Sequence, residues 1–258
     1  SGAVWFACEE ITDVKVTFNE NYSGAPATYD VVTEKGTSLG SNMPTDPNRE
    51  NYIFTGWNTA SDGSGTAFND STVVTADVTV YAQWIPKINL SVTANSDTVT
   101  YDGTLKTVSG FTSTGLLDGH TVSGVTASGS GTNVGEYPVT FSGTPVIMSG
   151  STNVTYMYNI SYVNGSLTIS ERALTITAND QSKTYGATFT FAGTEFTISG
   201  LEGADSVTSA TLVSDGAAAA AAVGDYTIAI SGAVGTGLDN YDITYESGTL
   251  KVTAATGE

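Results

Sequence analysis

Oxygen-bearing side chains that could bind calcium lie close together near residue 240. Asp239, Asn240 and Asp242 offer carboxylate and amide oxygens, the ligands that calcium takes in sets of about six to eight. These three residues are therefore the candidate metal ligands of the sequence. Their spacing differs from that of an EF-hand loop. Because Asp242 alternates with the apolar residues Tyr241 and Ile243, the alternative is an exposed strand face beside a turn.

One short segment matches the pattern of a serine nucleophile. Residues 36–40 read GTSLG, and the G-x-S-x-G pattern presents a reactive serine, here Ser38, at a strand–turn–helix corner of a hydrolase sheet. Such a serine needs a base. The single histidine, His120, and the single cysteine, Cys8, lie in other parts of the chain, and we expect His120 to be a solvated loop residue. We predict no catalytic residue and no cofactor, and expect that the chain is not an enzyme.

Two further patterns have a chemical interpretation. Gly129-Ser130-Gly131 and Gly232–Gly237 are rich in glycine but lack the lysine and hydroxyl residue of a phosphate-binding loop, so we predict turns between strands. A buried lysine can also form an isopeptide bond with an asparagine or aspartate. Lys15 and Lys251 lie on predicted strands and alternate with apolar residues, so their side chains should point to solvent and no such bond is expected.

The charge balance excludes two classes of partner. The 258 residues include 26 acidic and 8 basic side chains, for a formal net charge of −18. Such a chain has no electrostatic attraction to nucleic acid, and an anionic membrane surface repels it. It contains no apolar run long enough for membrane insertion. The acidic excess favours colloidal solubility, and we expect a monomer.

The residue types favour strands over helices. Glycine numbers 29, threonine, serine and valine are prominent, and leucine is scarce, a balance typical of strands and turns. With a single cysteine the chain has no intramolecular disulfide, which is compatible with bacterial export. We expect the sequence to be a segment of a longer protein.

The last two thirds of the chain contain one pattern twice. Residues 89–170 contain NLSVTAN, YDG, GLLDGHTV and NVGEYPVTFSG, and residues 173–253 contain ALTITAN, YGA, GLEGADSV and AVGDYTIAISG in the same order. A period of about 80 residues is the signature of a modular array. An array of near-copies that is poor in catalytic residue types usually supplies reach or binding surface.

The chain accordingly divides into three modules with short joints. We expect an N-terminal extension over residues 1–13, a first module over 14–85, repeats over 88–170 and 173–253, and a tail over 254–258. The joints Ile85-Pro86-Lys87 and Ser170-Glu171-Arg172 are too short to be flexible tethers. We therefore expect a semi-rigid string of modules, with strand pairing stopped at Pro86.

Alternating apolar residues predict the strands of each module. The matched aromatic and β-branched positions of the repeats are expected in the core; among them are Tyr158, Ile160, Tyr162, Tyr241, Ile243 and Tyr245. Asn164-Gly165 and Ser247-Gly248 predict tight hairpin turns after these strands. The run Ala217–Ala222, which replaces Ser128–Asn133 of the first repeat, is too short for a stable helix and predicts a loop insertion.

Two family resemblances follow from these motifs. The first module carries VTFNEN, YIFTGWNTASDGSGTAF and VTADVTVYAQW, and with these it resembles the Listeria–Bacteroides repeat, related to the B repeats of internalins. That resemblance implies a small β-grasp fold in which Trp57 and Trp84 pack in the core. The repeats, with Tyr101-Asp102-Gly103 and Tyr185-Gly186-Ala187, resemble the MBG/YDG family of bacterial adhesin repeats. That resemblance implies surface-exposed stalk or adhesive modules.

The expected fold is mostly β, in tandem small modules. A β-grasp module comes first, and the two similar β-rich repeats are either β-grasp variants or Ig-like sandwiches. A helix over Gly115–Val125 and Gly200–Ser209 would favour the β-grasp alternative.

Two functions remain open from the sequence. The first is a non-enzymatic segment of a bacterial cell-surface adhesin, located outside the cell or on its wall. It would act as a stalk or adhesive module and could bind a host glycan or a matrix protein. The second is a carbohydrate-binding accessory region of a large secreted enzyme. Trp5, Tyr22 and Tyr29 are the aromatic residues freest to stack on a sugar ring.

Overall fold

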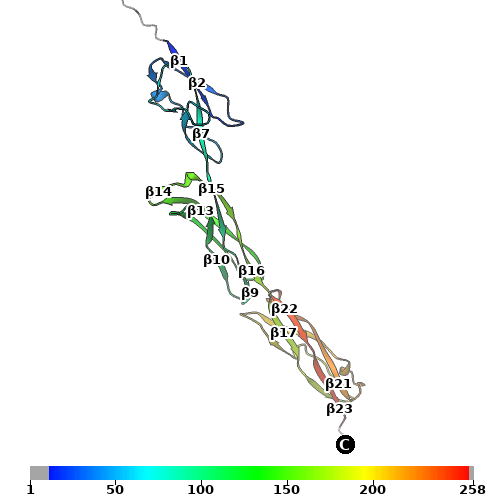
Figure 1. Ribbon diagram of the computed structural model, residues 1–258. Helices are drawn as coiled ribbons and strands as arrows, with labels where there is room; N and C mark the ends of the chain where they lie inside the picture. Colours follow the sequence, from blue (N-terminus) through cyan, green and yellow to red (C-terminus); the bar gives the residue numbers. More distant parts are fainter. Residues whose placement is uncertain (1–11, 256–258) are drawn as a thin grey trace, which may run out of the picture. The chain divides into compact units, whose positions relative to one another are not determined.

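The computed structural model describes residues 12–255, and Trp5 and Cys8 lie outside these residues. The described chain consists of strands joined by turns and a few 3₁₀ turns, so the predicted mostly-β fold is confirmed (Figure 1). It forms two compact units. The first holds the described residues up to Leu90 with residues 115–123 and 146–161, and the second holds 91–114, 124–145 and the residues from Tyr162 onward.

The first module is built on one five-stranded sheet. Its elements are β1 (Asp13–Asn19), β2 (Tyr29–Glu34), β3 (Thr37–Ser38), η1 (Gly40–Asn42), β4 (Tyr52–Asn58), β5 (Ala67–Phe68), β6 (Val73–Val74) and β7 (Val78–Pro86). The sheet order is β2-β1-β7-β4-β5, and β3 pairs with β6 separately. The first strand, β1, runs parallel to the last, β7, while its other neighbour is antiparallel. This order is that of a β-grasp sheet, with the 3₁₀ turn η1 where a longer helix is usual.

The core of the first module follows from the alternation of apolar residues. Val14, Val16 and Phe18 of β1 all point inward and are buried. The Phe18 ring meets the edge of Trp57 with the ring centroids 4.8 Å apart. The strand prediction for this segment and the core position of Trp57 are therefore confirmed. Trp84 is only half-buried.

Pairing does not stop at Pro86, contrary to the prediction. Pro86 is paired with Tyr52 across β4 and β7. The Lys87 N–H then donates to the Asn51 carbonyl oxygen at 2.9 Å. Proline lacks only the N–H donor, and the next residue supplies one, so the ladder closes one residue later.

The first repeat contains two sheets. Its elements are β8 (Ile88–Ala94), β9 (Asp97–Thr100), β10 (Lys106–Ser109), β11 (Phe111–Thr114), β12 (His120–Gly131), β13 (Gly135–Ser149), β14 (Thr152–Asn153), η2 (Thr155–Met157), β15 (Tyr158–Val163) and β16 (Gly165–Ser170). One sheet has the order β11-β8-β15. The other has the order β10-β12-β13-β16-β9, with β14 beside β13.

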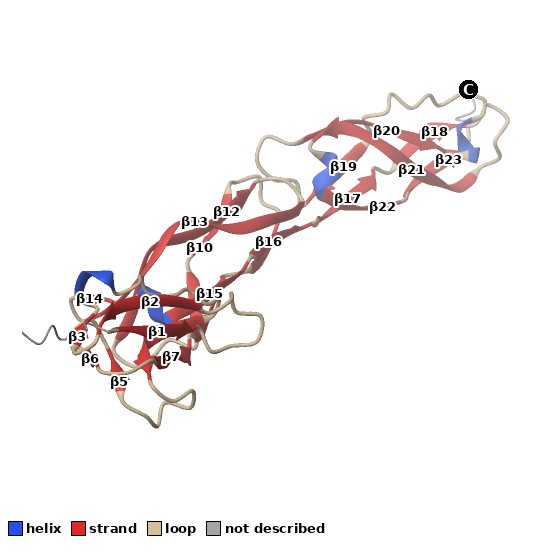
Figure 2. Ribbon diagram, turned by 90° about the horizontal axis from the view of Figure 1, so that it is seen from above, coloured by secondary structure: helices blue, strands red, loops and turns tan. Residues whose placement is uncertain are grey.

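The second repeat has the same plan. Its elements are β17 (Arg172–Ala178), β18 (Gln181–Thr184), β19 (Phe196–Ser199), β20 (Ser206–Val213), η3 (Asp215–Ala217), β21 (Gly224–Thr236), η4 (Leu238–Asn240), β22 (Tyr241–Glu246) and β23 (Gly248–Thr253). The sheets are β19-β17-β22 and β18-β23-β21-β20 (Figure 2). Turns and strands, not helices, form over residues 115–125 and 200–209. The two-sheet plan thus favours the sandwich alternative over the β-grasp variant.

The two predicted hairpins are wrong. β15 and β16 belong to different sheets, as do β22 and β23, so the chain crosses between sheets at Asn164 and Ser247. Close backbone packing requires a glycine at positions 165 and 248. A Cβ added to Gly165 would lie 2.2 Å from the Asn95 carbonyl oxygen, and a Cβ added to Gly248 would lie 2.5 Å from the Ala178 carbonyl oxygen.

Two other local predictions also need correction. The glycine-rich segments 129–131 and 232–236 lie inside β12 and β21 and are not turns. Gly131 packs against the face of Tyr137, since an added Cβ would come within 2.3 Å of that ring. Among the expected core positions, Tyr162 and Tyr245 are exposed at the ends of β15 and β22, because the strands extend beyond the core there.

Candidate functional site: the joint between the two repeats

A single carboxylate connects the two repeats within the second unit. Asp205 Oδ2 accepts one hydrogen bond from the Tyr101 hydroxyl and one from the Tyr241 hydroxyl, each at 2.8 Å. Tyr101 belongs to the first repeat, and Asp205 and Tyr241 belong to the second. The two rings meet edge to face with centroids 5.5 Å apart, a favourable geometry for aromatic pairs. Both tyrosines are buried.

Local structure places each of the three side chains. Tyr101 directly follows β9, and its N–H donates to the Ser170 carbonyl oxygen at 2.9 Å, which fixes it at the end of its repeat. Tyr241 opens β22, immediately after η4. Asp205 ends the turn before β20, and its N–H donates to the Glu202 carbonyl oxygen at 3.2 Å. The loops and strand ends of both repeats therefore converge at this carboxylate.

The buried tyrosines remain hydroxyl donors at alkaline pH. Burial, and then the hydrogen bond to the Asp205 carboxylate, raises the pKa of Tyr101 to about 12. The same two causes raise the pKa of Tyr241. Because removing either proton would place two negative charges side by side, both phenols stay neutral and donate.

A second buried polar residue adds to the joint. Asn240 Oδ1 accepts from the Val134 N–H of the first repeat at 2.8 Å. Its amide nitrogen donates to the Gly237 carbonyl oxygen at 3.1 Å and to Asn133 Oδ1 at 3.4 Å. Its amide group is thus satisfied across the joint, as a buried polar group requires.

The linker itself is held by Arg172. Its Nε donates to the Gly200 carbonyl oxygen at 3.1 Å, and its guanidinium forms an ion pair with Glu202. The short segment between the repeats is therefore fastened to the same turn that carries Asp205.

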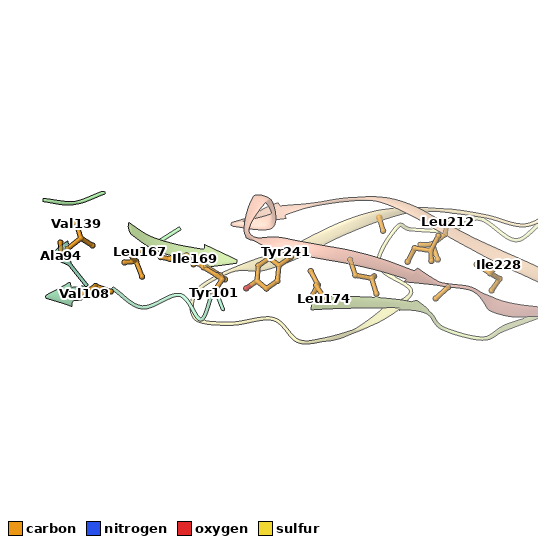
Figure 3. Close-up of a cluster of buried hydrophobic side chains, with 14 of the residues drawn as sticks. Ala94, Tyr101, Val108, Val139, Leu167, Ile169, Leu174, Leu212, Ile228 and Tyr241 are labelled. Atoms are coloured by element: carbon orange, nitrogen blue, oxygen red, sulfur yellow. The ribbon is translucent and has the colours of Figure 1, made fainter. Parts of the chain in front are cut away.

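Apolar packing is continuous through the joint. One cluster of buried side chains includes Leu167 and Ile169 of the first repeat and Leu174 and Ile176 of the second. Figure 3 shows Tyr101 and Tyr241 between Ile169 and Leu174. The joint is therefore part of a common core.

A related arrangement occurs at the start of the first repeat, within the first unit. The Tyr158 hydroxyl lies 2.6 Å from His120 Nδ1 and accepts from the Leu117 N–H at 3.2 Å. In the second repeat the Tyr241 hydroxyl accepts from the equivalent Glu202 N–H at 2.9 Å. His120 thus stands where the second repeat has Asp205. The expectation of a solvated loop residue was wrong, because His120 opens β12 and contacts a buried tyrosine.

The first module offers a separate cavity of about 370 Å³. Its walls include Met43, Asp46, Phe54, Trp57, Asn69 and Asp70. The Trp57 indole N–H is buried and is the one buried side-chain polar atom of the described residues without a hydrogen-bond partner. The cavity wall itself presents the carboxylates of Asp46 and Asp70 and the aromatic ring of Phe54, residue types that are typical of a small-molecule site.

An aromatic cluster also surrounds Arg49 in this module. The guanidinium carbon lies 3.6 Å from the centroid of the Tyr52 ring, 4.8 Å from that of Tyr22 and 5.9 Å from that of Trp84. The Trp84 indole N–H donates to the Glu20 carbonyl oxygen at 2.7 Å. These rings are engaged with a cation of the protein itself, so the cluster is a structural feature of the fold.

Family models match all three modules. The model described as MBG domain (YGX type) matches residues 90–168 and 174–251, which is more than half of the chain. The chain belongs to the MBG domain family. A model described as Listeria-Bacteroides repeat domain matches residues 15–83. No curated protein matches the chain.

The resemblances inferred from the sequence are therefore confirmed, in the expected order. MBG and Listeria-Bacteroides repeat domains together suggest a repeat region of a bacterial surface or adhesin-like protein, and hence an extracellular or cell-surface location. Neither match is to a catalytic family, which is compatible with a non-enzyme. None of the helices in the described chain has the length and apolar character needed to cross a membrane.

The candidate calcium ligands lie at the edge of the MBG joint. Asp239 and Asp242 are exposed, while Asn240 is buried and its amide is used between the repeats. Over residues 12–255 no group of three or more histidine, cysteine or acidic side chains is placed to hold a metal ion. Calcium binding at Asp239, Asn240 and Asp242 stays a prediction.

The other sequence candidates are placed apart from the joint. Ser38 lies on the two-residue strand β3 and is followed by the 3₁₀ turn η1, not by the helix of a nucleophile elbow. Lys15 and Lys251 are exposed. The joint residues Tyr101, Asp205 and Tyr241 were missed as a group, although each lies at a landmark shared by the two MBG repeats.

Proposed function

We propose that this chain is a non-enzymatic segment of a bacterial cell-surface adhesin, in which the two MBG repeats form a stalk. The observation that carries the proposal is the joint at Asp205. It links two MBG repeats through partly buried, satisfied polar contacts and one common apolar core. A stalk needs such fixed junctions, because a flexible junction would lose its reach to thermal motion.

The stability of the joint depends on its polar groups being paired. A buried network with every member satisfied makes its parts rigid, and removal of one partner leaves others unpaired at a cost of about 1–3 kcal/mol each. The second repeat is thereby locked to the first. The net charge of −18 supports a monomer with no nucleic-acid partner.

Force spectroscopy on single molecules tests the stalk. The chain would be tethered at both ends and pulled, and the unfolding forces of the MBG repeats compared between the natural chain and Asp205→Ala. We expect the variant to unfold at lower force, with the first-module event unchanged. Asp225→Ala, which alters an exposed carboxylate on β21, is the matched control. Equal forces for Asp205→Ala and Asp225→Ala would refute the stalk proposal.

A second function, binding of a glycan or of an extracellular protein by the first module, is supported by the cavity beside Trp57. The carboxylates of Asp46 and Asp70 can accept hydrogen bonds from ligand hydroxyls, and the aromatic side chains of the cavity offer an apolar wall. This arrangement suits a neutral sugar. A carbohydrate-binding accessory region of a secreted enzyme would use it in the same way.

Binding to immobilised glycans and matrix proteins tests this second function. Asp46→Ala removes an exposed carboxylate of the cavity wall and should abolish or strongly weaken the binding. Trp84→Phe removes an N–H that is already bonded to Glu20 and should leave binding intact. Saturable binding that is unchanged in Asp46→Ala would place the ligand elsewhere.

A further inference from the structure

The end of the second MBG repeat that holds Tyr185 and Val223 carries the residues that the first repeat buries in the joint. Tyr101 of the first repeat is 4% exposed, whereas the matching Tyr185 of the second is 51% exposed. Val134 packs against the joint core, whereas the matching Val223 is 59% exposed. Two large side chains that are covered in one copy are therefore uncovered in the other.

The backbone positions of these residues are equivalent in the two repeats. The Tyr101 N–H donates to the Ser170 carbonyl oxygen at 2.9 Å, and the Tyr185 N–H donates to the matching Thr253 carbonyl oxygen at 2.8 Å. A second pair of bonds fixes the residues before the two valines. The Tyr137 hydroxyl donates to the Asn133 carbonyl oxygen at 2.8 Å, and the Tyr226 hydroxyl donates to that of Ala222 at 3.0 Å.

A buried lysine holds the two loops of this end together. Lys183 on β18 is 8% exposed, and its ammonium donates to the Ala187 carbonyl oxygen at 2.9 Å and also to that of Ala218. One acceptor lies in the turn after Tyr185 and the other in the alanine run that precedes Val223. The Gly186 N–H further donates to the Ala219 carbonyl oxygen at 3.1 Å. The exposed pair is thus pre-organised.

From this equivalence we propose that the Tyr185–Val223 surface is a docking site for the N-terminal end of a further MBG repeat placed in tandem. The occupant has the character of the second repeat, with an aspartate and a tyrosine that receive Tyr185 as Asp205 and Tyr241 receive Tyr101. The proposal concerns the protein's own assembly and is independent of any adhesive ligand.

The start of the first repeat fits this surface less well. Its equivalents of Asp205 and Asn240 are His120 and Met157, and the His120 ring is already paired with Tyr158. A methionine cannot accept from the Val223 N–H as Asn240 accepts from that of Val134. A second copy of the chain is therefore the poorer occupant.

The second repeat departs from the first at two docking positions. Ala222 replaces Asn133 and so lacks the amide that meets Asn240 at 3.4 Å, which is the longer of the two contacts there. Ala187 replaces Gly103, the residue with positive φ at this place in the first repeat. In the second repeat the residue with positive φ there is Gly186. An added Cβ at Gly103 would lie 3.5 Å from Gly203 Cα, an ordinary contact distance, so an alanine at this place can be accommodated.

The test is a chain with a third repeat. A copy of residues 171–253 would follow Thr253 directly, so that the new linker repeats the natural Glu171-Arg172. Nitration of tyrosines by tetranitromethane, located by mass spectrometry, would then be compared with the natural chain. We expect nitration of Tyr185 to slow roughly tenfold, following the difference in exposure between Tyr185 and Tyr101. Tyr101 is the internal standard, protected in both chains.

Two variants of the third repeat make the result specific. With Asp205→Asn in the appended copy, protection of Tyr185 should be weaker, while the same change in the natural second repeat should affect Tyr101 alone. Lys183→Met should weaken the protection of Tyr185 without altering that of Tyr101.

The proposal is overturned if Tyr185 reacts equally fast in both chains while circular dichroism shows that the appended copy is folded. It is also overturned if Tyr185 of the natural chain becomes protected as concentration rises and a dimer forms, since the occupant would then be a second copy.

Discussion

Replacing Asp205 by alanine removes the acceptor shared by both joint tyrosines. Each of the two hydroxyls loses a hydrogen bond to a charged group, which contributes about 1.5–3 kcal/mol. Since the rings pack on one another and the losses are not additive, we expect the free energy of unfolding of the repeats to fall by about 3–5 kcal/mol. Asp205→Asn keeps an oxygen acceptor without the charge and should cost about 1–2 kcal/mol.

The position of the tryptophans allows the two parts of the chain to be followed separately. The three tryptophans, Trp5, Trp57 and Trp84, all precede the MBG repeats, so their fluorescence reports on the N-terminal part. Urea unfolding followed by circular dichroism also reports on the repeats. We expect Asp205→Ala to move the repeat transition to lower urea and to leave the fluorescence transition unchanged. Exposed carboxylates contribute within about 0.5 kcal/mol, so a loss equal to that of Asp225→Ala would refute the reasoning.

Three further predictions follow from the same contacts. Because the pKa of Tyr101 is raised from 10.0 to about 12, the unfolded chain releases this proton at lower pH than the folded chain. The contribution of Tyr101 to the stability of the repeats should therefore be complete below pH 10 and be lost as the pH rises toward 12. Tyr101→Phe should flatten this dependence of the urea midpoint on pH. Gly165→Ala, with its Cβ directed at the Asn95 carbonyl oxygen, should lower the unfolding free energy by about 1–3 kcal/mol in the same urea assay. Arg172→Gln breaks a partly exposed ion pair with Glu202 and removes the Nε hydrogen bond to the Gly200 carbonyl oxygen, and should cost about 1–2 kcal/mol; a loss as large as that of Asp205→Ala would contradict the ranking.

The sequence predicted the strands well because their signal is local. Val14, Val16 and Phe18 alternate with polar residues, and the alternation alone assigns them to the inner face of a sheet. The repeat also assigned the same strands twice, so that an ambiguous segment in one copy could be interpreted from the other.

The hairpins failed because the same dipeptide has two structural uses. Asn164-Gly165 has the residue types of a two-residue turn, but its glycine allows backbone to approach backbone where the chain changes sheet. Only the pairing partners of β15 and β16 distinguish the two uses, and these partners lie far away in sequence.

The joint could not be predicted from local patterns, since Tyr101 and Asp205 are 104 residues apart. A usable signal was present only for the opposite end of the second repeat, where Tyr185 lies. Copy-to-copy comparison aligns Lys183 with Val99, a partly buried residue, and therefore places a lysine on an inner face of the second repeat. A charged residue at a position that is apolar in the other copy indicates that its charge has a hydrogen-bond partner inside the protein. For Lys183 the partners are the Ala187 and Ala218 carbonyl oxygens.

The chemistry of the joint also explains how one surface can exist both covered and uncovered. The interior of each MBG repeat is made of aliphatic side chains such as Leu174 and Ile228, which would aggregate if exposed. The joint instead uses a tyrosine, Tyr101, whose hydroxyl donates to Asp205 when covered, whereas an exposed tyrosine such as Tyr185 leaves its hydroxyl accessible to solvent. A phenylalanine at the same position would keep the apolar contact, lose the recognition of the carboxylate, and leave an exposed end that any apolar surface could bind.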